Sequence, residues 1–187
     1  YKIVLAGNKI WCDLAEELPY WDEILMIDVK QFKTFSRYRW DLLRKVRNLG
    51  VQISIQPTFS REFYHGDSLV QASGALRKVS SAGDMANRNW LKKFIADSWN
   101  TELIPASTEA LTELERNAEF FSGLTNYTHL TCYPQLDIPD FWLSSEWKEK
   151  TFYILVPGTS GAVAGKEWPS AFFSDLATKV FRQTEWE

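Results

Sequence analysis

Residues 35–56 read FSRYRWDLLRKVRNLGVQISIQ, and this stretch decides the fold class. Four apolar residues recur at helical spacing within residues 35–49: Tyr38, Leu42, Val46 and Leu49. This spacing predicts a helix with one apolar face, and Gly50 supplies its C-terminal stop. Residues 51–56 then alternate between apolar and polar side chains, which predicts a strand. A helix that leads directly into a strand is the repeating unit of a parallel α/β sheet.

The same alternation of strands and helices extends in both directions along the chain. Short apolar runs predict further strands at residues 2–6, 24–27 and 76–79. Helical periodicity predicts helices at residues 9–18, 61–73 and 109–121. Gly7-Asn8 is expected to form a turn after the first strand. Repeated βα units predict a Rossmann-like parallel sheet with helices on both faces.

Two further expectations concern the second half of this sheet domain. Residues 80–107 are polar and poorly periodic, so we expect a long surface excursion there. The helix at residues 109–121 is expected to bury one apolar stripe, made of Leu111, Leu114, Ala118 and Phe121.

The pattern divides the chain into three parts. Residues 1–125 are predicted to form the sheet domain, and residues 126–150, which contain Pro134 and Pro139, a connector. A new βα unit follows over residues 151–187, with a strand at 152–156, a glycine-rich turn and a helix over 169–181. Because one strand and one helix cannot bury a core, we expect this part to be the truncated start of a second domain.

Composition limits the function classes. The 187 residues are 45% hydrophobic and 24% charged with a net charge of −3, which does not favour a nucleic-acid binder. No apolar run reaches the ~20 residues of a membrane span. The 9 Trp, 7 Tyr and 12 Phe residues suit a carbohydrate ligand, or simply fill cores. Cys12 and Cys132 have no metal or disulfide spacing, which indicates free thiols in a reducing cytoplasm, and no secretory signal precedes the first strand.

The loop over residues 157–169 is the strongest candidate binding site. Gly158 allows close backbone approach, Thr159 and Ser160 offer hydroxyl groups, and Lys166 brings a cation. The helix that follows adds free N–H groups suited to a phosphate. The alternative is a surface turn with a solvated lysine. The loop does not match a Walker phosphate loop, because the positions of its first glycine and its hydroxyl carry Ser160 and Glu167.

A second candidate site follows the strand at 51–56. Ser60 and Arg61 can bind acceptor phosphates at the start of the next helix, or they can be a helix cap and a solvated arginine. His65 can be an acceptor-side base or ligand, although a lone histidine is more often a polar surface residue. Two histidines without further ligands make no metal site. The basic helix at 35–49 can meet anionic lipid or be a solvated face.

Several motifs resemble glycosyltransferase family 9, the ADP-heptose:lipopolysaccharide heptosyltransferases. Residues 157–169 are similar to its strand–P-G-[TS]-[TS]…K-x-W-P–helix element, and residues 19–24 (PYWDEI) resemble its P-x-x-D-E-[IV] segment. Residues 56–61 (QPTFSR), followed by Gly74-Ala75, resemble a further strand–loop segment. The resemblance covers nearly the whole chain, in matching order.

The resemblance implies a bacterial transferase of the two-domain glycosyltransferase B architecture. Its N-terminal domain takes a lipopolysaccharide-type glycan acceptor, and its C-terminal domain takes ADP-heptose, without a cofactor or metal, in the cytoplasm and peripherally at the inner membrane. Gly158, Thr159, Ser160 and Lys166 would then bind the donor, with Lys166 offsetting charge on the leaving diphosphate. Ser60 and Arg61 would bind the acceptor.

The same resemblance implies that this chain is inactive alone. The family opens with a strand and a G-D loop that carries its suspected general base, and neither has a counterpart here. The alternatives are a non-catalytic sugar- or nucleotide-binding protein that keeps the fold, and an unrelated nucleotide-binding α/β regulator.

Overall fold

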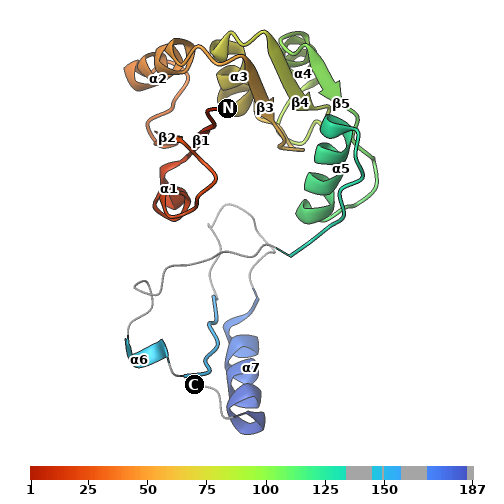
Figure 1. Cartoon of the computed structure of the whole chain (residues 1–187). Helices are drawn as coiled ribbons and strands as arrows, with labels where there is room; N and C mark the ends of the chain where they lie inside the picture. Colours follow the sequence, from red (N-terminus) through yellow and green to blue (C-terminus); the bar gives the residue numbers. More distant parts are fainter. Residues whose placement is uncertain (134–144, 149, 157–167, 185–187) are drawn as a thin grey trace. The chain divides into compact units, whose positions relative to one another are not determined.

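The computed structural model describes residues 1–133, 145–148, 150–156 and 168–184. The chain divides into two compact units, Tyr1–Leu136 and Asp137–Glu187. Among the described residues, all the strands belong to the first unit (Figure 1).

A two-stranded parallel sheet opens the first unit. Strand β1 (Val4–Asn8) pairs with β2 (Glu23–Ile27), and helix α1 (Lys9–Glu16) connects the two. The turn expected at Gly7-Asn8 is absent, because both residues belong to β1. The side chain of Asn8 instead accepts a hydrogen bond from the backbone N–H of Ile10 and caps α1 directly.

A three-stranded parallel sheet follows in the order β3 (Ile53–Gln56), β4 (Arg77–Ser81) and β5 (Glu102–Ile104). Ile55 is in register with Val79, and Val79 with Glu102. Every ladder in both sheets is parallel. The parallel α/β class predicted from the sequence is therefore confirmed.

Helices join the strands from both sides. They are α2 (Arg37–Asn48), the short π-helix η1 (Phe63–Asp67), α3 (Ser68–Ser73), α4 (Trp90–Ser98) and α5 (Glu113–Thr125). Figure 1 shows α2, α3 and α4 on one side of the strands and α1 and α5 on the other. This arrangement follows from the direction in which each crossover moves along the sheet.

The helix predicted from residues 35–49 is confirmed as α2. Ser36 caps it by accepting a hydrogen bond from the backbone N–H of Arg39, and Gly50 ends it at a φ of 60°. Leu42 of α2 packs with Ile27 and Phe32 in one core, and Leu69 of α3 lies against the same core. This cluster packs the end of β2 and helix α2 against α3.

The surface excursion expected over residues 80–107 is wrong. Strand β4 continues to Ser81, and α4 and β5 follow it. The spacing of apolar residues does not predict helix α4, because its apolar side chains Trp90, Leu91 and Phe94 are exposed. Its inward side is formed by Ala96 and by Lys93 and Asp97, which are ion-paired with each other.

Helix α5 begins later than predicted and buries a different face. Thr112 and Glu115 form a capping box, which starts the helix at Glu113 and leaves Leu111 outside it. Phe120 is 3% exposed, whereas Phe121 of the expected stripe is 41% exposed. Phe120 packs with Val79 and Ile104 in the second core.

The second unit contains two described helices, α6 (Ser145–Lys148) and α7 (Ser170–Gln183). The predicted helix over 169–181 is confirmed by α7, which starts directly after Pro169. The predicted strand at 152–156 is wrong, because these residues carry no ladder to any described strand. Its side chains pack instead: the Phe152 ring lies 5.4 Å from that of Trp147, and the Tyr153 hydroxyl donates to Ala177 O at 3.5 Å.

Two smaller expectations are answered as well. Both cysteines are free thiols, as predicted, with Cys12 buried and Cys132 exposed. Among the described helices, none has the length and apolar character needed to cross a membrane.

The neighbours Phe120 and Phe121 allow a direct test of the α5 face. We expect Phe120→Ala to lower the free energy of unfolding by about 3–5 kcal/mol, because it empties a core position. Phe121→Ala, the matched control, should cost less than about 1.5 kcal/mol, mainly the ring contact at 5.5 Å. Urea denaturation measures both, and equal losses would contradict the observed orientation of α5.

Candidate functional site

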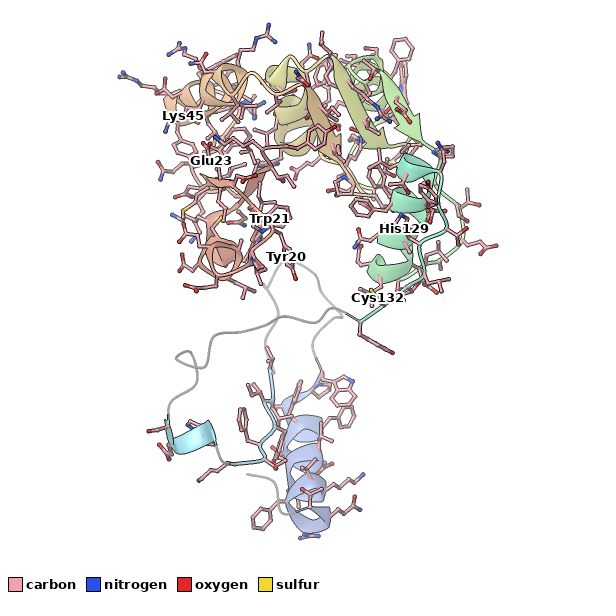
Figure 2. All side chains as sticks on the ribbon, viewed as in Figure 1. Tyr20, Trp21, Glu23, Lys45, His129 and Cys132 are labelled. Atoms are coloured by element: carbon pink, nitrogen blue, oxygen red, sulfur yellow. The ribbon has the colours of Figure 1, made fainter. Side chains whose placement is uncertain are left out.

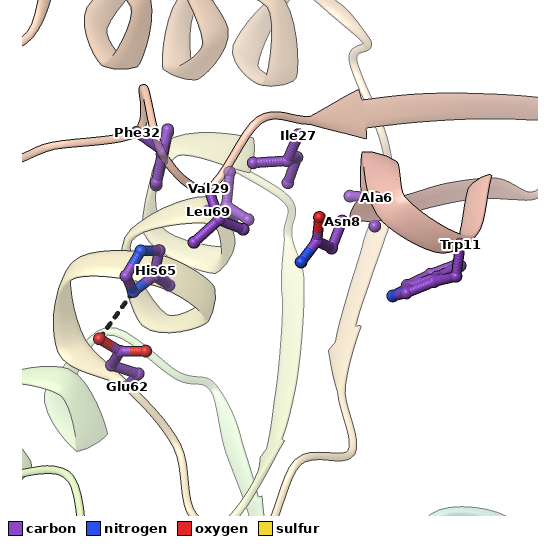
Figure 3. A pocket seen from close by; sticks show the side chains of 10 residues that line it. Ala6, Asn8, Trp11, Ile27, Val29, Phe32, Glu62, His65 and Leu69 are labelled. Atoms are coloured by element: carbon purple, nitrogen blue, oxygen red, sulfur yellow. Dashed lines mark ion pairs between the residues drawn. The ribbon is translucent and has the colours of Figure 1, made fainter. Parts of the chain in front are cut away.

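An open cavity of about 290 Å³ lies at the carboxyl ends of β1 and β2 in the first unit. Its walls come from the end of β1, from α1, from the segment after β2 and from η1, and they include Asn8, Trp11, Val29, Phe32, Glu62 and His65. Figure 3 shows these side chains around the cavity. Ligands of open parallel α/β sheets bind at this edge, where strands end and helices begin.

An imidazole–carboxylate pair lies on one wall. His65 Nδ1 is 2.8 Å from Glu62 Oε1 (Figure 3), and the Phe32 ring lies 5.7 Å from the imidazole. Within the described residues, Nδ1 makes no hydrogen bond, so its contact with Glu62 is defined by the short distance alone. An imidazole beside a carboxylate is an arrangement found in bases that take a proton from a hydroxyl group. The structure places His65 in the lining of the cavity.

The opposite wall presents an aromatic plane. Trp11 projects from α1 and remains 43% exposed. Gly7 makes room for it, because a Cβ at that position would collide with the indole ring. An exposed indole beside a cavity is the kind of surface on which a sugar ring stacks.

Asp28, the residue directly after β2, lies between the lining residues Ile27 and Val29. Its carboxylate is paired with Lys9 and accepts hydrogen bonds from Gln31 Nε2 at 2.8 Å and from the Lys30 backbone N–H at 3.0 Å. The hydrogen bond from Lys9 is the main reason that the pKa of Asp28 falls to about 2. The Tyr38 hydroxyl accepts a further bond from the Asp28 backbone N–H at 2.8 Å. Asp28 therefore stays ionised and fixes the loop after β2.

Arg61 does not have the role that the sequence suggested. Its side chain is 0% exposed, and its guanidinium contacts Asp67 at 2.9 Å, Asp97 at 2.6 Å and Ser81 O at 2.7 Å. Burial lowers the pKa of Arg61, while the two carboxylates oppose the shift. Arg61 is a structural residue that cannot reach an acceptor phosphate from this position. The prediction that Arg61 binds the acceptor is therefore wrong.

Ser60 lies beside this network at the edge of the loop after β3. Its hydroxyl donates to Asp84 Oδ2 at 3.0 Å, and its carbonyl accepts a bond from Asn87 Nδ2 at 2.9 Å. These bonds join the loops that follow β3 and β4. Ser60 is half-buried and is not among the residues that line the cavity.

The predicted donor-side residues Gly158, Thr159, Ser160 and Lys166 lie outside the described residues. Within the part of the chain that is described, no group of three or more His, Cys, Asp or Glu side chains is arranged to hold a metal ion. Comparisons of the chain with protein-family models, curated proteins and solved structures found no match. The chemistry of the site therefore rests on its own residues.

Sequence reasoning missed Trp11 as a lining residue, and it missed the Lys9–Asp28 ion pair beside the cavity. One signal could have found Asp28, because it directly follows an apolar strand run, where parallel sheets collect their ligand-binding residues. Trp11 carries no such signal, since an aromatic residue in a helix is more often a core residue.

The lowered pKa of Asp28 predicts a pH dependence of stability. An unfolded aspartate has a pKa near 3.9, so the contribution of Asp28 is complete above about pH 4 and is lost as the pH falls towards 2. We expect Asp28→Asn to flatten this part of the profile of unfolding free energy against pH. Asp41→Asn, at an exposed surface pair on α2, is the control and should leave the slope unchanged. Equal slopes for Asp28→Asn and the unaltered chain would contradict the Lys9 pairing.

Proposed function

We propose that the chain is the acceptor-side part of a glycosyltransferase related to family 9, which moves a sugar, heptose, from an ADP-sugar to a lipopolysaccharide-type glycan. The observation that carries the proposal is the cavity at the strand ends, with His65 and Glu62 on one wall and Trp11 on the other. The motif order at residues 19–24, 56–61 and 157–169 supports the family.

The acceptor sugar stacks on Trp11 and presents one hydroxyl group to His65. As the hydroxyl oxygen bonds to the anomeric carbon of the donor, the bond from that carbon to the diphosphate breaks. Its electron pair leaves with the nucleoside diphosphate, and the hydroxyl proton moves to the imidazole. Glu62, at 2.8 Å from Nδ1, stabilises the imidazolium that forms. Because the new bond forms as the old one breaks, the transfer inverts the configuration at the anomeric carbon in a single displacement.

The donor is held by the loop at residues 157–169 in this proposal. Gly158, Thr159 and Ser160 supply backbone and hydroxyl donors to the diphosphate, and Lys166 offsets the charge that builds on it. The enzyme works in the cytoplasm, peripherally at the inner membrane where its acceptor lies.

The first test is calorimetric titration of the full-length parent protein with ADP, UDP and GDP, followed by ADP-heptose. We expect ADP to bind in preference to UDP and GDP, and the sugar to strengthen binding, because the pyrophosphate and the sugar are both contacted. Binding without nucleotide preference would contradict the proposal and favour a nucleotide-binding regulator. Absent binding would favour a protein that keeps the fold without the activity.

The two histidines of the chain provide a matched pair for the acceptor side. In the parent enzyme, His65→Gln should lower kcat by about 10²–10⁴-fold, because the proton acceptor is lost. Donor affinity should stay unchanged. His129→Gln is the control: His129 lies beyond α5 and contacts Thr125 Oγ1 at 2.8 Å, away from the cavity lining (Figure 2). Similar rates for both variants would exclude His65 as the base.

A further inference from the structure

The two ionisable side chains that line the cavity form a pair without excess positive charge. Glu62 Oε1 lies 2.8 Å from His65 Nδ1 on one wall (Figure 3). With the carboxylate ionised, the pair carries one negative charge when the imidazole is neutral and no net charge when it is protonated. The Glu62 side chain is 53% exposed, so its carboxylate acts on a ligand that enters the cavity. An anionic group on this wall would meet a like charge, which disfavours its binding.

Two cations beside the cavity are already engaged by other groups. Lys9, the first residue of α1, is ion-paired with the Asp28 carboxylate, whose side chain is 10% exposed. If Lys9 turned to a ligand, it would leave that carboxylate without its cation, which is costly for a group so far from water. Arg39 is buried and stacks on Phe32, with its guanidinium carbon 4.6 Å from the ring centroid. Both cations are therefore held in place by the fold rather than offered to a ligand.

The guanidinium groups at the ends of β3 and β4 are enclosed in the same way. Arg61, which the sequence offered to an acceptor phosphate, is paired with Asp67 and Asp97. Arg88 pairs with the second oxygen of the same Asp67 carboxylate at 3.1 Å. Both arginine side chains are inaccessible to solvent, and neither lines the cavity. The fold thus directs these cations into ion pairs and leaves a carboxylate at the cavity.

The other walls of the cavity favour a ligand with an uncharged, partly apolar surface. Ile27, Val29, Phe32 and Leu69 contribute apolar side chains, and Trp11 contributes its indole. A charged group pressed against such side chains loses its hydrating water and gains no hydrogen bond in return. The C–H face of a neutral sugar ring loses little water there and gains from the removal of apolar surface from solvent.

Asn8 adds a neutral hydrogen-bonding group to this lining. Its Oδ1 accepts a hydrogen bond from the backbone N–H of Ile10 at 3.2 Å, which fixes the side chain at the start of α1. The Nδ2 group makes no hydrogen bond to the ranges of the chain that the structure describes. Its two N–H groups can donate to the hydroxyl oxygens of a sugar. This polar contact does not require a charge on the ligand.

We propose that the sugar unit that enters this cavity is uncharged, and that the site selects it against units that carry a phosphate or carboxylate group. The inference rests on the proposed function and narrows its acceptor to a glycan whose reacting unit is a neutral sugar. A cavity of about 290 Å³ is small for a ligand pocket, so it receives one sugar unit. Charged groups elsewhere on the glycan stay in solvent.

The test is titration of the full-length parent protein with a methyl heptoside and with its phosphate monoesters, one for each ring hydroxyl group. The ¹H–¹⁵N NMR signal of the Trp11 indole reports occupancy of the cavity. We expect the neutral heptoside to bind most tightly, and the monoesters that turn their phosphate towards Glu62 to bind at least about tenfold more weakly.

The possible outcomes separate this inference from the proposed function. A monoester that binds more tightly than the neutral heptoside, or a whole set that binds equally, would overturn the inference and leave the glycan acceptor in place. If no heptoside shifts the Trp11 signal, the proposed function fails, and the inference fails with it.

A pair of variants separates the charge of the cavity from the charge of the whole protein. Val29→Lys places a cation in the lining at a position that is 42% exposed, and it should remove most of the preference for the neutral heptoside. Ile10→Lys adds the same charge on α1, at a position that is 77% exposed and outside the lining, and it should leave the preference unchanged. Equal effects of the two variants would overturn the inference, because the preference would then follow from net charge alone.

Discussion

A buried ionic network at the carboxyl ends of β3 and β4 fixes the surroundings of the candidate site. The Asp67 carboxylate forms ion pairs with Arg61 at 2.9 Å and with Arg88 at 3.1 Å. All three side chains are inaccessible to solvent. Asp97 of α4 contacts Arg61 at 2.6 Å from the edge of the network. Removing one partner from such a network leaves a buried charge, which costs several kcal/mol. Because Asp67 ends η1, the network also determines where Glu62 and His65 lie, and with them the cavity wall.

The sequence predicts those helices and strands whose apolar side chains face inward. It does not predict an element whose inward side chains are polar. Helix α2 follows from its spacing because Leu42 and Val46 are buried. Helix α4 does not, since its inner side carries Lys93 and Asp97 and its exposed side the aromatic residues. Arg61 was expected at a ligand because its partners Asp97 and Ser81 lie 36 and 20 residues away, and no local pattern signals such pairs. The His65–Glu62 contact is a local i,i+3 pair, yet only the fold places it in a cavity.

The candidate site lies at the strand ends, where its lining depends directly on the fold. The cavity is lined by the end of β1, by α1 and by η1, so its shape depends on how these elements pack as much as on His65 and Trp11.

The central claim is that the cavity between Trp11 and His65 receives a glycan acceptor. The most direct measurement is ¹H–¹⁵N NMR of the parent protein during titration with a lipid-free lipopolysaccharide core oligosaccharide, with the imidazole and indole nitrogens observed. Saturable shifts at the His65 imidazole and the Trp11 indole, with His129 unmoved, are the predicted result. Shifts confined to other residues, or none at concentrations that support transfer, would contradict the account.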